Sequence, residues 1–252
     1  MFKFRPFKAK QSAGVIQKVS KRDLMHIAAP HHYFQWGEEA LKRTQLTLAR
    51  DDVAQEVRGV KRILDLPCGH GRELRYFKAA FPEAQITACD LDRDAVDFCA
   101  QTFGATPVYS HVDPQQVSLE GQFDLIWCGS LLTHLNISSW VGFLKLFQAH
   151  LAPNGILIFT THGPHIAELM RKGELELGVP PQAVQSILAD YERGGFGYSD
   201  YENQSGIGVS LSSPEWVRSC LAEIDGLRLI EYAERGWFAH QDSVACIQSS
   251  DS

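Results

Sequence analysis

Five short apolar runs alternate with helix-like segments between residues 60 and 161, and this alternation constrains the fold more than any other feature. The runs span residues 63–67, 85–90, 106–109, 123–128 and 156–161. Because they lack strict polar alternation, they are typical of strands buried on both faces. Strands that alternate with helices predict an α/β fold, with a doubly wound parallel sheet and helices on both faces. Ligands bind such sheets outside the carboxyl ends of the strands.

Apolar residues at helical spacing occupy the gaps between these runs. They predict helices over residues 72–81, 93–103 and 139–151. Asp92 can cap the second helix and Gly104 can end it, because a carboxylate accepts from free helix N–H groups and glycine tolerates the left-handed conformation. Ser138 or Ser139 is the predicted cap of the third helix.

The region after residue 162 departs from this pattern. Residues 164–193 carry helical spacing, whereas residues 194–210, GGFGYSDYENQSGIGVS, are rich in Gly and Tyr and predict a long irregular loop. A long loop between core elements is often a lid over a site. We therefore expect residues 164–211 to form a substrate cap.

The C-terminal part predicts one more helix and two strands. Either Ser212 and Glu215 form a capping box, or Ser213 is the cap and Pro214 opens the first turn. The strands are expected over residues 227–233 and 243–248. The loop between them is too short for a helical crossover, so this pair should be antiparallel.

The stretch ILDLPCGHGREL, residues 63–74, predicts a strand, a tight turn and the start of a helix. Gly69 and Gly71 lack a Cβ, so the backbone of the turn can approach a ligand closely. A dinucleotide-binding turn has a further glycine three residues later, but Leu74 occupies that place. The turn therefore argues against NAD.

An acidic residue, Asp90, ends the second apolar run. A carboxylate at that place can accept hydrogen bonds from both hydroxyls of a ribose. The alternative is that Asp90 or Asp92 only caps the following helix. We expect Asp92 to be the cap and Asp90 to be the ribose ligand, which indicates an adenosine-containing ligand.

These motifs, together with VDPQQVSLEGQFDLIWCGSLLTHL and LAPNGILIFTTHG further along, resemble the class I S-adenosylmethionine-dependent methyltransferase family. The resemblance covers about residues 60–162 and the two final strands. It implies a Rossmann-like sheet of seven strands, mostly parallel with an antiparallel last strand, and S-adenosylmethionine as the cofactor. Two residues depart from the family pattern: Pro67 replaces a common glycine, and Arg72 stands where a small residue is frequent.

The same resemblance implies a set of cofactor-binding residues. Those expected around the methionine portion are Asp65, Cys68, Gly69, Gly71, Cys128 and Gly129. Asp90 would hold the ribose and Leu91 would lie against the adenine. Val112 and Asp113 would lie beside the adenine amino group.

Two histidines at the ends of predicted strands are candidates for a catalytic base. A hydroxyl or ammonium acceptor must lose a proton, and imidazole suits that role near neutral pH. His134 follows the fourth run and His162 follows the fifth, so both should lie at the ligand-binding edge. A hydrogen-bonded packing role is the alternative for either residue.

The 252-residue chain has a formal net charge of −6. It has no apolar run long enough for a membrane span and no apolar signal segment, so we expect a cytoplasmic protein. The six cysteines form no CxxC pair, and no metal site is predicted. Residues 1–22 carry seven basic side chains and no acidic one. This basic arm could touch nucleic acid, although a frayed terminus is favoured and nucleic acid is not the expected partner.

The predicted organisation is a basic arm and helical cap over residues 1–59, followed by a methyltransferase domain over residues 60–252. The predicted activity is in-line transfer of a methyl group from S-adenosylmethionine to an oxygen or nitrogen atom of a small-molecule acceptor. The alternatives are an NAD(P)-dependent oxidoreductase and a non-catalytic protein that binds a partner protein or nucleic acid. The acceptor itself depends on loops that vary freely on one fold.

Overall fold

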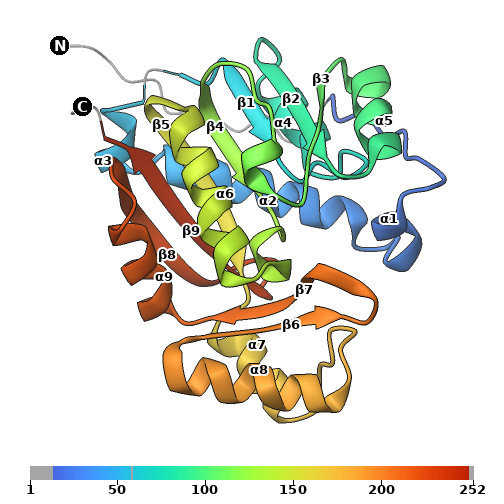
Figure 1. Cartoon of the computed structure of the whole chain (residues 1–252). Coiled ribbons are helices and arrows are strands. Elements are labelled where there is room, and N and C mark those ends of the chain that lie inside the picture. The colour runs from blue at the N-terminus through green and yellow to red at the C-terminus, as the bar shows by residue number, and fades with distance from the viewer. Residues whose placement is uncertain (1–13, 58, 250–252) are drawn as a thin grey trace.

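A seven-stranded mixed sheet organises the chain in the computed structural model, which describes residues 14–57 and 59–249 (Figure 1). The strands follow the order β3-β2-β1-β4-β5-β9-β8. Their bounds are β1 (Arg62–Asp65), β2 (Gln85–Asp90), β3 (Thr106–Tyr109), β4 (Phe123–Cys128), β5 (Leu151–Thr161), β8 (Leu227–Trp237) and β9 (Gln241–Gln248). All five predicted runs and both C-terminal strands are therefore present.

The strand order reverses beside β1. This strand pairs in parallel with both β2 and β4, so the chain crosses back over β1 after β3. Strand β9 is antiparallel to both β5 and β8, which confirms the predicted antiparallel last strand. The reversal leaves a crevice outside the carboxyl ends of β1 and β4, where ligands bind in such sheets.

Helices cover both faces of the sheet, as the alternation predicted. Side chains along β1 alternate between two apolar clusters, as strand geometry requires. Leu64 packs in the cluster of α6 (Ile137–His150) and α9 (Pro214–Ala222). Ile63 packs in the cluster of α2 (Tyr33–Leu48), α4 (Leu74–Ala80) and α5 (Arg93–Phe103). The sheet is thus buried on both faces, which explains its continuous apolar runs.

Helix caps agree with the sequence at two helices and differ at a third. Asp92 caps α5 by accepting from two backbone N–H groups, and Gly104 ends that helix in the left-handed conformation. Ser213 caps α9 with Pro214 in the first turn, which decides between the two alternatives. The predicted caps of α6, Ser138 and Ser139, are wrong. Asn136 is the cap because α6 begins two residues before the predicted start, at Ile137.

Residues 164–212 form a separate substructure at the bottom of Figure 1. It contains α7 (Pro164–Arg171), α8 (Pro181–Gly194) and a hairpin of β6 (Phe196–Tyr201) and β7 (Gln204–Ser212). A small apolar core of its own includes Ile166, Ile187 and Leu211. We call residues 164–212 the cap segment.

The hairpin corrects the prediction that residues 194–210 form an irregular loop. The glycines that suggested a loop instead allow close packing of backbones. A Cβ on Gly197 would lie 2.0 Å from the carbonyl oxygen of Ile187 in α8. A Cβ on Gly208 would lie 1.9 Å from the carbonyl oxygen of Ser199 in the partner strand. These glycines are required by strand pairing and helix contact rather than by turns.

The N-terminal region forms α1 (Leu24–Ala28), α2 and α3 (Asp51–Ala54), and α2 packs on one face of the sheet. The basic side chains of residues 1–13 lie outside the described residues, so the basic-arm hypothesis stays a prediction. Among the described residues, no helix is both long and apolar enough to cross a membrane.

A buried arginine connects this N-terminal region to the glycine turn through hydrogen bonds. Arg75 is 1% exposed and donates to the carbonyl oxygens of Ile16 and Lys18, at 3.0 and 3.2 Å. The same guanidinium donates to the Tyr33 hydroxyl at 3.1 Å and to the Gly71 carbonyl at 2.8 Å. One side chain therefore connects three segments that are distant in sequence.

We predict that Arg75→Met lowers the free energy of unfolding by about 3 kcal/mol, because several buried acceptors lose their donor. Urea denaturation measures this loss. Proteolytic cleavage within residues 14–32 should also become faster than in the parent protein. The control is Arg218→Met, which removes an exposed arginine that lies over Tyr232. Equal stability of the two variants would contradict the role assigned to Arg75.

Candidate functional site

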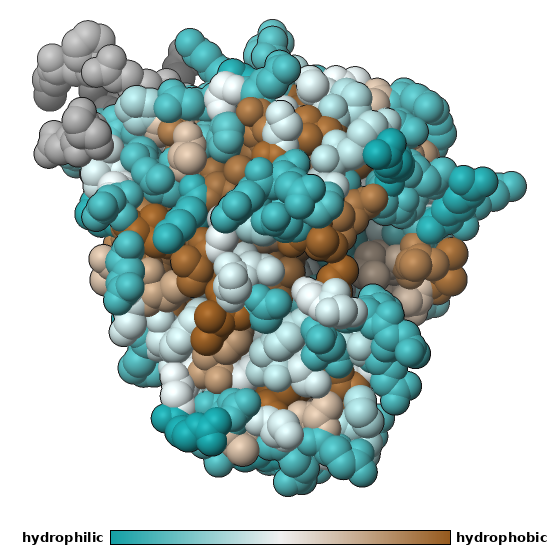
Figure 2. Space-filling view, viewed as in Figure 1, coloured by the Kyte–Doolittle hydropathy of each residue, from teal (hydrophilic) through white to brown (hydrophobic). Residues whose placement is uncertain are grey.

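A cavity of about 570 Å³ lies at the strand-order reversal, outside the carboxyl ends of β1, β2 and β4. Its walls come from the glycine turn, the ends of these strands, the N-terminal helices and the cap segment. In Figure 2 apolar side chains border the hollow on the right, in the region where Figure 1 shows α1. Leu24, Met25 and Ile27 of α1 are all more than half exposed. The cavity size suits a small-molecule ligand.

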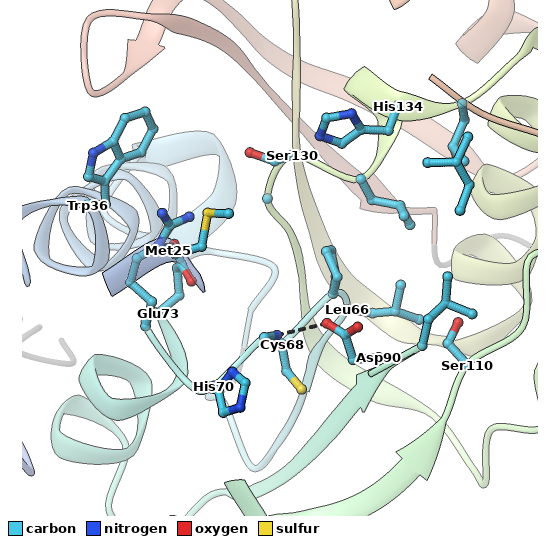
Figure 3. Close-up of a pocket in the computed structure, with 18 of the residues that line it drawn as sticks. Met25, Trp36, Leu66, Cys68, His70, Glu73, Asp90, Ser110, Ser130 and His134 are labelled. Atoms are coloured by element: carbon cyan, nitrogen blue, oxygen red, sulfur yellow. Dashed lines mark hydrogen bonds and ion pairs between the residues drawn. The ribbon is translucent and has the colours of Figure 1, made fainter. Parts of the chain in front are cut away.

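The glycine turn forms part of the cavity wall at Gly69. This residue has a φ of 46°, and no atom lies within 4 Å of the place a Cβ would occupy. Its N–H donates to Oδ2 of Asp90 at 2.8 Å (Figure 3). The preceding residue, Cys68, also lines the cavity and donates its N–H to the Cys89 carbonyl. The turn is thus tied to β2 at two points and stays open toward the cavity at Gly69.

The second glycine of the turn has a different role. Gly71 does not line the cavity. Its φ is 76°, and a Cβ there would lie 2.4 Å from the ring of Phe103 and 3.2 Å from Sγ of Cys99. We expected a ligand to lie close to the backbone of Gly71. In the structure, side chains of α5 occupy that place. Sequence alone does not separate the two glycines because both reasons require a missing Cβ.

Asp90 lines the cavity at the end of β2. Oδ1 accepts from the N–H of Asp92 at 3.0 Å, and Oδ2 accepts from Gly69. Burial raises the pKa of Asp90 above its ordinary value, while the two backbone donors oppose that shift. Each carboxylate oxygen keeps a further lone pair, so Asp90 can still accept hydrogen bonds from a ligand.

Of the three residues predicted beside the adenine, two line the cavity and one does not. Leu91 and Val112 are each 47% exposed and line the cavity. Asp113 does not line it. Asp113 instead caps a short 3-10 helix and accepts from the Gln115 N–H and the Gln116 side chain. These hydrogen bonds, the Gln115 backbone bond first, lower the pKa of Asp113. Its prediction as an adenine ligand therefore lacks support from the position of the carboxylate.

Four of the predicted cofactor residues do not line the cavity: Asp65, Gly71, Cys128 and Asp113. Asp65 is fully buried at the end of β1, and neither carboxylate oxygen has a hydrogen-bond partner among the described residues. Burial raises its pKa well above the ordinary range. Gly129, by contrast, lines the cavity as predicted. Asp65 and Cys128 lie in the core because they are inward-facing strand residues, and their contact with a cofactor stays a prediction.

A pair of oppositely charged residues directly after the glycine turn also lines the cavity. The sequence did not predict it as a ligand site. Arg72 and Glu73 both line the cavity, and Nε of Arg72 donates to Oε1 of Glu73 at 2.6 Å. The Arg72 guanidinium also lies 5.2 Å from the Trp36 ring centroid and 5.6 Å from that of Trp237. The aromatic wall holds the guanidinium in place.

The pair keeps free hydrogen-bonding capacity on both sides. The Nη groups of Arg72 and Oε2 of Glu73 have no hydrogen-bond partner among residues 14–57 and 59–249. A guanidinium fork binds carboxylates and a carboxylate binds ammonium groups. The two side chains together therefore complement the zwitterionic end of an α-amino acid. The only sequence signal was the departure of Arg72 from the expected small residue.

His134 lines the cavity in a fixed tautomer. Its Nδ1 lies 2.9 Å from the carbonyl oxygen of Gly208 in the cap segment. A carbonyl only accepts, so Nδ1 carries the hydrogen and Nε2 keeps its lone pair. Burial lowers the pKa of His134, so the ring is neutral near pH 7. In Figure 3 the ring extends toward the side of the cavity that holds Ser130.

His162 also lines the cavity but is 4% exposed. Burial, with smaller contributions from His134 and His240, lowers its pKa to about 3. Its Nδ1 is buried without a hydrogen-bond partner in the described part of the chain. His162 is therefore neutral and mostly enclosed, whereas His134 has the more open position.

A network of uncharged polar groups, also missed by the sequence analysis, lies beside these histidines. Ser130, with a φ of 64°, donates its N–H to Oγ1 of Thr160 at 2.8 Å. Oγ1 of Thr160 donates to Oε1 of Gln241 at 2.6 Å, and Nε2 of Gln241 donates to Oγ of Ser130 at 3.0 Å. Ser130 and Gln241 line the cavity. The network joins the ends of β4 and β5 to the start of β9.

We predict that Gly71→Ala lowers the free energy of unfolding by about 3 kcal/mol, because the methyl group overlaps Phe103 and the left-handed conformation is strained. The matched variant Gly69→Ala should lose only about 1 kcal/mol, from conformational strain alone. Urea denaturation compares the two. A larger loss for Gly69→Ala would contradict the different roles of these glycines.

The buried imidazole of His162 predicts that stability falls with acidity. Its folded pKa of about 3 lies below the unfolded value of about 6.5, so below pH 6.5 the unfolded chain binds a proton that the native chain excludes. This group should reduce the free energy of unfolding by about 2 kcal/mol between pH 6.5 and 5. His162→Gln should flatten this dependence in urea titrations, whereas the exposed control His31→Gln should leave it unchanged. An unchanged slope in His162→Gln would refute the assignment.

The family comparison agrees with the position of the cavity. Residues 64–157 match a sequence family described as a methyltransferase domain. This stretch contains the glycine turn, Asp90, Ser130 and His134.

Similar proteins include a malonyl-[acyl-carrier protein] O-methyltransferase of Bacillus cytotoxicus, 34% identical over 103 residues, which are 40% of this chain and 35% of that protein. The chain spans about a third of the length of the first curated relatives it matches.

Two solved structures share the fold over nearly their whole length. One is an amino pentose methyltransferase of Micromonospora echinaspora, with 15% identity, a TM-score of 0.58 and coverage of 88% of this chain and 97% of that one. The other is DesVI of Streptomyces venezuelae, with 14% identity, a TM-score of 0.60 and coverage of 92% and 100%. The methyltransferase-domain match over residues 64–157 and the seven-stranded fold shared with these structures agree with each other.

Proposed function

We propose that this chain transfers the methyl group of S-adenosylmethionine to an oxygen or nitrogen atom of a small-molecule acceptor. The observation that carries the proposal is the bond between the Gly69 N–H and the Asp90 carboxylate in the wall of the cavity. It places an open backbone position beside a carboxylate with free lone pairs. This combination suits the ribose of an adenosyl cofactor.

The residues present fit the whole cofactor. Asp90 would hold the ribose, with Leu91 and Val112 against the adenine. Arg72 and Glu73 would hold the amino-acid end, and Figure 3 shows Glu73 and Asp90 on opposite sides of Cys68. The free Nη groups of Arg72 and the free Oε2 of Glu73 support this fit. The cofactor would supply an electrophilic methyl group.

The protein's own part is to orient the acceptor, exclude water and accept a proton. Alignment of the reacting atoms contributes a large share of the rate in such displacements. Leu177, Gly206 and Ile207 of the cap segment line the cavity and would shield an acceptor. His134 is the proposed base because Nε2 keeps its lone pair. His162, our second candidate, would support the pocket as a neutral group.

The descriptions of the similar proteins support a small-molecule acceptor, but they do not identify which compound this chain methylates. One relative methylates malonyl-[acyl-carrier protein] and a solved neighbour methylates an amino pentose, according to their descriptions. The NAD(P)-dependent alternative is disfavoured by Leu74 in the place of a third glycine and by the family match. The non-catalytic alternative rests on the basic arm alone, most of which lies outside the described residues.

Cofactor binding can be tested with two ligands that differ only at the amino-acid end. S-adenosylhomocysteine has that end, whereas 5′-methylthioadenosine lacks it. We predict that Arg72→Ala weakens binding of S-adenosylhomocysteine about 10- to 100-fold, because a charge-assisted bond is lost, and leaves 5′-methylthioadenosine binding within twofold. Asp90→Ala should weaken both ligands to a similar degree. Isothermal titration measures all four affinities.

Arg171→Ala serves as the control because Arg171 lies on α7 and forms an exposed ion pair with Glu192. It should bind both ligands like the parent protein. Failure of the parent protein to bind S-adenosylhomocysteine would refute the proposed function. Equal losses for both ligands in Arg72→Ala would refute only the place of the amino-acid end.

A further inference from the structure

Two groups in the cavity wall have opposite hydrogen-bonding roles. They are the imidazole of His134 and the hydroxyl of Ser130, which lie on the same side of the cavity in Figure 3. Both are set by bonds to the rest of the protein, so the group that binds between them must match both roles.

His134 offers an acceptor. The Gly208 carbonyl at 2.9 Å requires a hydrogen on Nδ1, since two acceptors do not bond to each other. The Tyr201 hydroxyl, 3.1 Å from the same nitrogen, lies at this end of the ring as well. Nε2 therefore presents a lone pair, and it has no partner among the described residues.

Ser130 offers a donor. Thr160 donates to Oε1 of Gln241 at 2.6 Å, and the Gln241 amide then donates to Oγ of Ser130 at 3.0 Å. The reverse contact, from the Ser130 hydroxyl to Oε1 of Gln241, is longer at 3.3 Å than the bond from the Gln241 amide. The hydrogen of Ser130 is therefore available to a ligand in the cavity.

A ligand group that fits must donate to His134 and accept from Ser130. A hydroxyl does both and keeps a second lone pair for the methyl group. A neutral amine has a single lone pair, an ammonium group only donates, and a carboxylate only accepts. We propose that the acceptor is an alcohol or phenol whose hydroxyl binds between His134 and Ser130, so that the chain is an O-methyltransferase of neutral hydroxyl compounds. The inference rests on the proposed function and narrows it to one acceptor class.

The remaining charges in the wall agree with a neutral acceptor. Glu73 is paired with Arg72, and both oxygens of Asp90 accept backbone hydrogen bonds. Asp23 accepts from two backbone N–H groups and from the Tyr33 hydroxyl. No unpaired carboxylate lies beside His134 in the described wall to hold an ammonium ion.

The rest of the acceptor should be apolar. Met25, Ala28 and Ala29 of the N-terminal region and Leu177 and Ile207 of the cap segment line the cavity. Burial of apolar surface against these side chains would supply most of the binding free energy.

The transfer step balances with these residues. As the acceptor oxygen forms its bond to the methyl carbon, the carbon–sulfur bond breaks and its electron pair stays on sulfur. The hydroxyl proton moves to Nε2 of His134, and the product is a methyl ether. Ser130 donates to a remaining lone pair of the oxygen and orients it; it is a positioning residue.

A matched set of acceptors tests the class. The parent protein is incubated with labelled S-adenosylmethionine and a mixture of alcohols and phenols, amines and carboxylic acids built on the same apolar bodies. Mass spectrometry identifies the products. We expect methyl ethers to form at least 10-fold faster than N-methyl or ester products. Faster formation of amine or ester products, or no ether product at all, overturns the inference.

Variants test the two groups separately. Ser130→Ala should lower kcat/KM for the best hydroxyl acceptor about 10-fold and leave S-adenosylhomocysteine binding unchanged. His134→Gln should remove the acidic limb of the pH–rate profile, an effect that a packing role would not produce. Ser138→Ala, an exposed serine on α6, is the matched control. Unchanged kinetics in Ser130→Ala overturn its role.

Titration of the parent protein with S-adenosylhomocysteine tests the proposed methyltransferase function separately from the proposed hydroxyl acceptor class. Absence of binding refutes the proposed function itself. Binding that is accompanied by amine or carboxylate methylation refutes only the assignment of the hydroxyl class.

Discussion

The bond between the Gly69 N–H and the Asp90 carboxylate organises the site. It joins the turn after β1 to the end of β2 and uses one lone pair of the carboxylate, while others stay open to the cavity. The left-handed conformation of Gly69 makes this geometry possible without a side chain in the way. The Arg72–Glu73 pair and the start of α4 come directly after this turn in the chain.

The fold was largely predictable because its signals are local. Apolar runs, helical spacing and caps such as Asp92 and Gly104 depend on a few adjacent residues. The failures arose where a residue's role depends on distant contacts. Gly197 and Gly208 suggested a loop, yet both permit backbone contacts with segments elsewhere in the cap segment. Local composition could not distinguish a loop from a hairpin in this segment, because the difference depends on tertiary packing.

The site was predictable only in part for the same reason. Gly69, Asp90, Leu91 and His134 reach the cavity as the motif order indicated. Asp65, Gly71, Asp113 and Cys128 carry the same sequence signal but face the core or cap a short helix. Ser130 and Gln241 are 111 residues apart, so no motif could connect them before the sheet order was known. The only sign of Arg72 in the sequence was that it stands where related proteins often have a small residue.

The direction of β9 determines where one part of the cavity wall originates. Because β9 runs against its neighbours, it begins, rather than ends, at the edge where β5 finishes. The turn between β8 and β9 thereby supplies His240, and the first residue of β9 supplies Gln241, to the cavity. The other half of the cavity belongs to β1 and β2 on the far side of the sheet. A single cavity is therefore assembled from strands on both sides of the point where the strand order reverses.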